Sequence, residues 1–134
     1  MCRLKVKCMQ RELVTLLNNN VGKRYSFLTN NCFYLILDPL VKSGFYKNKD
    51  YKRLFKLCNF NKDNEIYEIM KNEFCESEFL EENCLILTKM DSIYYNHLII
   101  KIGNCFYEIT QKDKVFNKKC INIIIIKDSK FFKF

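Results

Sequence analysis

The sequence predicts a single α+β domain, with helices in the first half of the chain and strands in the second. Apolar residues recur at helical spacing up to about residue 74, whereas after Glu82 they form short runs of strand length. Helices followed by strands, rather than alternating with them, are typical of the α+β class. A length of 134 residues suits one domain, and a hydrophobic content of 49% is enough for a core.

The first predicted helix covers residues 9–19, where Leu13, Leu16 and Leu17 lie on one stripe. The polar segment that follows, residues 18–22, is typical of a helix end because it finishes in glycine. Residues 25–31 are then expected to form a short loop.

A second helix is expected to begin at residues 30–32 and to run past Leu40. Pro39 leaves two possibilities: the helix kinks there, or it restarts with Asp38 as N-cap and Pro39 in the first position. Residues 50–58 and 64–74 predict two further helices, joined by the charged segment 59–65.

Four strands are expected in the second half, at residues 84–88, 94–102, 105–110 and 121–126. A tight turn at residues 103–104 joins the second and third of these, so residue 102 faces 105, 99 faces 108 and 97 faces 110. One face of this hairpin is apolar and core-like: it carries Leu98, Ile100, Ile102, Cys105, Tyr107 and Ile109. The other is more polar: it carries His97, Ile99, Lys101, Phe106, Glu108 and Thr110.

Composition restricts the function classes. The chain has eight cysteines but one histidine, which excludes metal sites with several histidines. The cysteine spacing contains no CxxC pair, so a zinc knuckle is not expected, and most of the thiols are expected to be core residues. The formal net charge of +8 suits a polyanionic partner, although the abundance of Lys, Asn and Ile indicates coding bias as the simpler explanation.

No targeting segment is evident. The first eight residues lack the apolar core and the cleavage site of a signal peptide, and no apolar stretch approaches the length of a membrane span. We therefore expect synthesis in the cytoplasm, thiols that remain reduced and no membrane insertion.

Two residues, Cys32 and Glu108, could form a catalytic group with His97, the only histidine. The hairpin register places Glu108 diagonal to His97, where a carboxylate can orient an imidazole. Cys32 is the strongest candidate for a nucleophile, because it follows capping residues and opens an apolar helix, where the helix dipole favours a thiolate. A half-buried histidine beside an unrelated glutamate, and a core thiol, remain the alternatives.

The order of these residues resembles the NlpC-type papain-like cysteine peptidases, a family of cell-wall amidases and endopeptidases that also occurs in bacteriophage tails. The segment 21–25 is similar to a Val-Gly-x-x-Tyr stretch of that family, and residues 31–34 stand where the family has Asp-Cys-Ser-Gly. The three strands that follow in the family correspond here to residues 83–87, 97–104 and 105–108. The chain differs in having Asn31 before the nucleophile and Phe33 and Tyr34 after it.

The resemblance implies a papain-like fold over the whole chain, 1–134, and a hydrolase with a Cys-His-Glu triad. Cys32 would be the nucleophile, His97 the general base and acid, and Glu108 the group that orients His97. Tyr25 and Asn31 would lie at the substrate and oxyanion site. The resemblance implies no metal or cofactor. The expected substrate is a peptidoglycan stem peptide or another peptide, and a place in the virion would add other phage tail proteins as partners.

Two other functions stay open. The substitutions around Cys32 are compatible with a catalytically inactive structural, tail-assembly or interaction module on the same fold. A basic nucleic-acid-binding protein is the third possibility, but its lysines and arginines are spread along the chain and no specific nucleic acid is expected as partner.

Overall fold

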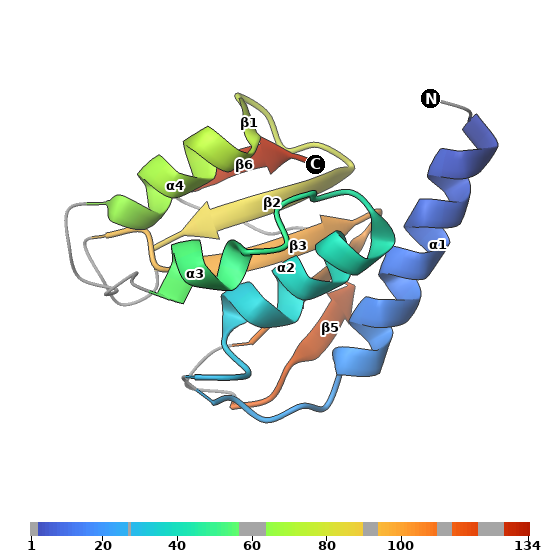
Figure 1. Ribbon diagram of the computed structural model, residues 1–134, viewed down its shortest axis with the longest axis horizontal. Helices are drawn as coiled ribbons and strands as arrows, with labels where there is room; N and C mark the ends of the chain where they lie inside the picture. The colour runs from blue at the N-terminus through green and yellow to red at the C-terminus, as the bar shows by residue number, and fades with distance from the viewer. Residues whose placement is uncertain (1–2, 27, 57–63, 90–93, 110–113, 121–127) are drawn as a thin grey trace.

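The computed structural model describes residues 3–26, 28–56, 64–89, 94–109, 114–120 and 128–134. Within these ranges, helices precede a six-stranded antiparallel sheet, as expected for the α+β class (Figure 1). The helices are α1 (Arg3–Asn20), α2 (Cys32–Ser43), α3 (Tyr51–Lys56) and α4 (Glu65–Glu73). The strands are β1 (Cys75–Ser77), β2 (Asn83–Thr88), β3 (His97–Ile102), β4 (Cys105–Glu108), β5 (Asn117–Cys120) and β6 (Lys130–Lys133).

The sheet has the strand order β1-β6-β2-β3-β4-β5, so β1 and β5 form its edges. The predicted hairpin is present: Ile102 pairs with Cys105 across the turn, and Gly103 adopts the left-handed conformation with φ 58°. The sheet continues through β2, which pairs with β3 along its whole length.

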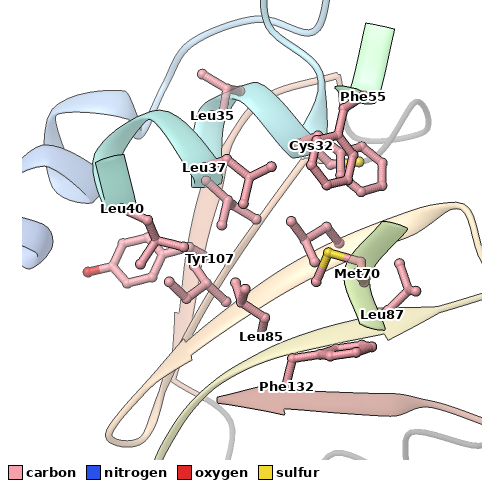
Figure 2. Close-up of a cluster of buried hydrophobic side chains, with 14 of the residues drawn as sticks. Cys32, Leu35, Leu37, Leu40, Phe55, Met70, Leu85, Leu87, Tyr107 and Phe132 are labelled. Carbon is pink, nitrogen blue, oxygen red and sulfur yellow. The ribbon is translucent and has the colours of Figure 1, made fainter. Parts of the chain in front are cut away.

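One main core lies between the helices and one face of the sheet. All four helices contribute buried side chains to it, among them Leu13 of α1 and Met70 of α4. Figure 2 shows residues of α2 and of the strands meeting in this core, including Leu37, Leu85 and Phe132. The predicted core face of the hairpin, with Leu98, Ile100 and Tyr107 buried, is confirmed.

The opposite face of the sheet carries a smaller apolar cluster. Cys84, Ile86, Ile99 and Phe106 are buried in it, and Phe131 packs against them at partial burial. The hairpin face that was expected to be mixed and polar is therefore partly apolar. His97 and Glu108 lie at the edge of this mixed environment.

The structure resolves the alternatives at Pro39: α2 runs continuously from Cys32 to Ser43 with the proline inside it. The helix ends at Gly44, whose left-handed backbone (φ 92°) lets its N–H bond to the carbonyls of Leu40 and Val41.

Some predicted boundaries were wrong. The first helix begins at Arg3 rather than Met9, although its first turn is solvent-exposed, with Leu4 at 67% exposure. Residues of high helix propensity extend it beyond its packed stripe. The strand expected from residue 94 begins only at His97, and β4 ends at Glu108. The predicted strand at 121–126, the last residue of the strand 105–110, and residues 57–58 of the third helix lie outside the described residues.

Three strands were not predicted from the sequence: β1, β5 and β6. Their sequences are short and rich in charged or polar residues, so they lack a clear alternating pattern. They are strands because they pair with neighbours: β1 with β6, β6 with β2, and β5 with β4.

The expectation that most cysteines are core residues was wrong for the described thiols. Of the six, Cys32 and Cys84 are buried, Cys105 is half-buried, and Cys8, Cys75 and Cys120 are exposed. The exposed ones lie on the outer part of α1 and on the two edge strands, where few side chains cover them. Within the described part of the chain, no helix is both long enough and apolar enough to cross a membrane.

Candidate functional site

Cys32 is the first residue of α2, as the capping pattern predicts. Asn31 is the N-cap: its backbone is extended (φ −91°, ψ 172°), and its side-chain oxygen accepts a hydrogen bond from the Tyr34 N–H at 2.9 Å. The Cys32 N–H is one of the first amides of the helix, which have no partner within the helix itself. The Cys32 side chain is buried, with 7% exposure, at the N-terminal end of α2 (Figure 2).

His97 is the first residue of β3 and is 3% exposed. Its Nε2 lies 2.9 Å from Oε2 of Glu108, the diagonal contact that the hairpin register predicts. The Cys32 side chain is close enough to the imidazole to contribute to its electrostatics. The structure thus brings together three side chains from α2, β3 and β4 that were predicted as a catalytic group.

The two partners of His97 set its charge state. Burial by itself lowers the pKa of His97, because a low-dielectric surrounding disfavours the charged ring. The hydrogen bonds to Cys32 and Glu108 and the charges of both groups outweigh burial and raise the pKa of His97 to about 9. The imidazole is therefore expected to be protonated at neutral pH.

Glu108 is the matching anion. The hydrogen bond with His97 lowers the pKa of the Glu108 carboxyl against the opposing effect of burial, and the charges of His97 and Lys119 lower it further. The Lys119 ammonium lies 3.6 Å from Oε1, on the side of the carboxylate away from the histidine contact. The carboxylate is thus held ionised between two cations.

Tyr25 and Asn31 lie on the segment that leads into α2. Tyr25 is half-buried against the main core, and its backbone N–H donates to the Lys114 carbonyl at 2.8 Å. The side chain of Asn31 is buried, and its oxygen caps α2. A role of either residue at an oxyanion stays a prediction.

Phe33 and Tyr34, the bulky residues after Cys32, point into different surroundings. Phe33 is 2% exposed and stacks on Phe55 of α3, with ring centroids 5.2 Å apart, so it is part of the core. Tyr34 is half-buried and packs edge-on against Tyr51. Phe33 therefore contributes to the main core, and Tyr34 is the less buried of the two.

Tyr34 also lines a small polar pocket beside the first turns of α2, with a volume of about 120 Å³. Neither Cys32 nor His97 lines it. The sequence did not indicate this pocket, because its residues come from four separate segments and share no local pattern. Its lining comprises Asn20, Lys23, Thr29, Asn30, Tyr34, Leu35, Asp38, Tyr51 and Lys52.

The residue types in this arrangement are those of nucleophilic catalysis. A thiol, an imidazole that interacts with it and a carboxylate that contacts the same imidazole are the parts of an activated nucleophile. The chain matches no protein-family model, no curated protein and no solved structure.

Proposed function

We propose that the protein is a cysteine peptidase or amidase in which Cys32 is the nucleophile, His97 the general acid and base, and Glu108 the residue that orients His97. The observation that supports this most directly is that the imidazole of His97 contacts Glu108 at 2.9 Å and also interacts with the Cys32 side chain. The fold identity that accompanies this proposal is the papain-like, NlpC-type domain implied by the sequence resemblance.

In this mechanism the thiolate of Cys32 attacks the carbonyl carbon of an amide, and the π electrons move to the oxygen. In this proposal the Cys32 N–H, at the positive end of α2, stabilises that oxygen, and Tyr25 of the preceding segment contributes to the same site. Collapse of the intermediate breaks the C–N bond, and the leaving amine takes the proton from His97. The product is an acyl thioester on Cys32.

Water then completes the reaction. It loses a proton to His97 as it attacks the thioester, and the C–S bond breaks to release the acid and restore the thiolate. Because Nε2 faces Glu108, we assign Nδ1 to the proton transfers. The carboxylate holds the ring in one tautomer and stabilises its charged form.

For the substrate we propose the amide bonds of peptidoglycan stem peptides, and for the setting a bacteriophage tail. Both rest on the sequence resemblance. Cleavage of such an amide bond requires a nucleophile and a proton donor, and the chain supplies both. Neither acylation of Cys32 nor hydrolysis of the thioester needs a metal or cofactor.

A second candidate is favoured by one specific observation: both reacting groups are nearly inaccessible, with Cys32 at 7% and His97 at 3% exposure. A substrate carbonyl has to reach the sulfur. A catalytically inactive structural, tail-assembly or interaction module would keep the same contacts without that requirement.

The two candidates are separated by digestion of purified peptidoglycan. We expect the wild type to release new amino groups, and Cys32→Ala to release none. Cys84→Ala is the matched control, because Cys84 is also a buried thiol but lies in the small cluster on the other face of the sheet; this variant should retain activity. Equal release by Cys32→Ala and wild type would exclude Cys32 as the nucleophile, and no release by the wild type would favour the inactive module.

Alkylation tests activation without requiring the substrate. With iodoacetamide at pH 7, we expect Cys32 to react ahead of the exposed Cys8 and Cys75, and His97→Gln to slow Cys32 without affecting the other two. Mass spectrometry of tryptic peptides measures each rate, and Cys32 is the only cysteine in peptide 25–42. Rates that simply follow solvent exposure, with Cys32 slow in both proteins, would contradict an activated thiol.

A further inference from the structure

Two cysteines outside the candidate site face each other across neighbouring strands. Cys105, the first residue of β4, is the direct Cα partner of Cys120, the last residue of β5. Their side chains therefore project from the same face of the sheet, and each thiol lies within reach of the other's electrostatic influence. Opposed residues in an antiparallel pair have Cα atoms about 4.5 or 5.5 Å apart, and both values lie within the range of roughly 4.4–6.8 Å found for disulfides.

The pair is accessible to small reagents. Cys120 is exposed on the edge strand β5, and Cys105 is half-buried beside it. The hydrogen bond from Cys120, partial burial and the charge of Cys120 raise the pKa of Cys105, while the ammonium of Lys118 opposes the rise. The more exposed Cys120 is therefore the better placed of the two to attack an external reagent, and Cys105 to act second.

We propose that Cys105 and Cys120 form a redox-reactive dithiol that a disulfide oxidant of the glutathione class converts into a cross-strand disulfide. The thiolate of Cys120 attacks one sulfur of the oxidant and expels one thiolate, which leaves a mixed disulfide on Cys120. Cys105 then loses its proton and attacks the Cys120 sulfur, and the second thiol leaves. The protein loses two electrons and two protons, and the oxidant becomes two thiols.

The disulfide would fasten the edge strand to the sheet beside the candidate site. The same pair of strands continues from the two cysteines toward the candidate site. Along it, Phe106 pairs with Lys119 and Glu108 pairs with Asn117. Lys119 is also the cation that contacts Glu108. The dithiol is thus placed to control how firmly β5 is held, and this inference does not depend on hydrolase activity.

The test is incubation of the reduced protein with glutathione disulfide, followed by alkylation of remaining thiols and non-reducing tryptic mapping. Cys105 and Cys120 are each the only cysteine in peptides 102–112 and 120–127. We expect these two peptides to be recovered linked to each other. In Cys105→Ser, the reaction should stop at the mixed disulfide on peptide 120–127.

Cys75 provides an internal control, because it is exposed on the other edge strand and its Cα partner is Lys133 rather than a thiol. It should form only a mixed disulfide. Oxidation should also raise the Tm of the wild type and of Cys75→Ser by several degrees, and leave that of Cys105→Ser unchanged.

Three results would overturn the proposal. The first is that peptides 102–112 and 120–127 are recovered unlinked, with free thiols or with separate glutathione adducts. The second is that either peptide is linked to another cysteine in preference. The third is that the Tm rises equally for wild type and Cys105→Ser.

Discussion

At the scale of single residues, His97 determines the electrostatics of the candidate site. It is the only histidine in the chain, and it joins Cys32 from the first half of the sequence to Glu108 from the second. Its charge is sustained by these contacts against a burial effect of opposite sign. Removing one contact should therefore shift its titration measurably.

The uniqueness of His97 makes that titration simple to observe by NMR, since one imidazole signal needs no assignment. We expect the signal of the wild type to titrate with a pKa of about 9, well above the ordinary value of about 6.5. In Glu108→Gln, the carboxylate charge is lost while the shape is kept, so the pKa should fall. Cys84→Ala, which leaves the three side chains in place, should titrate as the wild type does. A wild-type pKa at or below the ordinary value would show that burial dominates.

The sequence allowed part of this site to be predicted. The contact between His97 and Glu108 follows from the two-residue turn, because the turn fixes which residues are diagonal across the hairpin. The position of Cys32 at a helix start follows from the capping residues before it. Its contact with His97 depends on how α2 packs on the sheet, and no local pattern encodes that; only the family resemblance suggested it.

At the scale of elements, Pro39 explains why α1 and α2 fit together as they do. A proline within a helix has no N–H to donate to the carbonyl four residues earlier, which here belongs to Leu35. The side-chain amide of Asn20, the last residue of α1, donates to the Leu35 carbonyl at 2.9 Å. Asn20 is 9% exposed, so the end of one helix supplies the hydrogen bond that the other helix lacks.

A double-mutant cycle tests this compensation. Asn20→Ala should lower the free energy of unfolding by about 1–2 kcal/mol, because a largely buried carbonyl loses its donor. In the Pro39→Ala background, the new N–H at residue 39 can bond to Leu35, and the same Asn20→Ala change should cost less. Urea denaturation of the four proteins gives the coupling energy.

The neighbouring Asn19 is exposed and provides the control, since Asn19→Ala should have little effect in either background. If Asn20→Ala were equally destabilising with proline and with alanine at residue 39, the compensation would be refuted.

The sequence pattern raised Pro39 as a difficulty for α2, but the hydrogen-bond donor that compensates for it lies in another helix. Periodicity alone therefore left the alternatives open.

The elements that could be predicted are those with their own periodicity. The stripe of Leu13 and Leu17 identified α1, and the apolar run from Cys84 to Leu87 identified β2. The strands β1 and β5 carry exposed, polar residues and are defined by the neighbour they pair with. Their existence depends on long-range contacts, which a local reading of the sequence does not contain.

At the scale of the whole molecule, the buried ion pair of His97 and Glu108 makes stability depend on pH in two directions. The pKa of Glu108 is lowered in the folded state, so its contribution is present above its unfolded pKa of about 4.5 and is lost as the pH falls. The pKa of His97 is raised to about 9. Its contribution is complete below its unfolded pKa of about 6.5 and is lost as the pH rises through 9.

Between pH 6.5 and 9 the folded-state imidazole therefore binds a proton that the unfolded-state imidazole has released, and the contribution of His97 to stability falls with rising pH. We expect the free energy of unfolding of the wild type, relative to His97→Gln, to decrease by on the order of 2–3 kcal/mol from pH 6 to pH 10. Urea denaturation of both proteins at several pH values measures this difference, and the comparison cancels the titration of the lysines, tyrosines and remaining cysteines. A difference that stays constant over this range would mean that His97 is neutral in the folded protein, and the ion pair with Glu108 would then not contribute to stability.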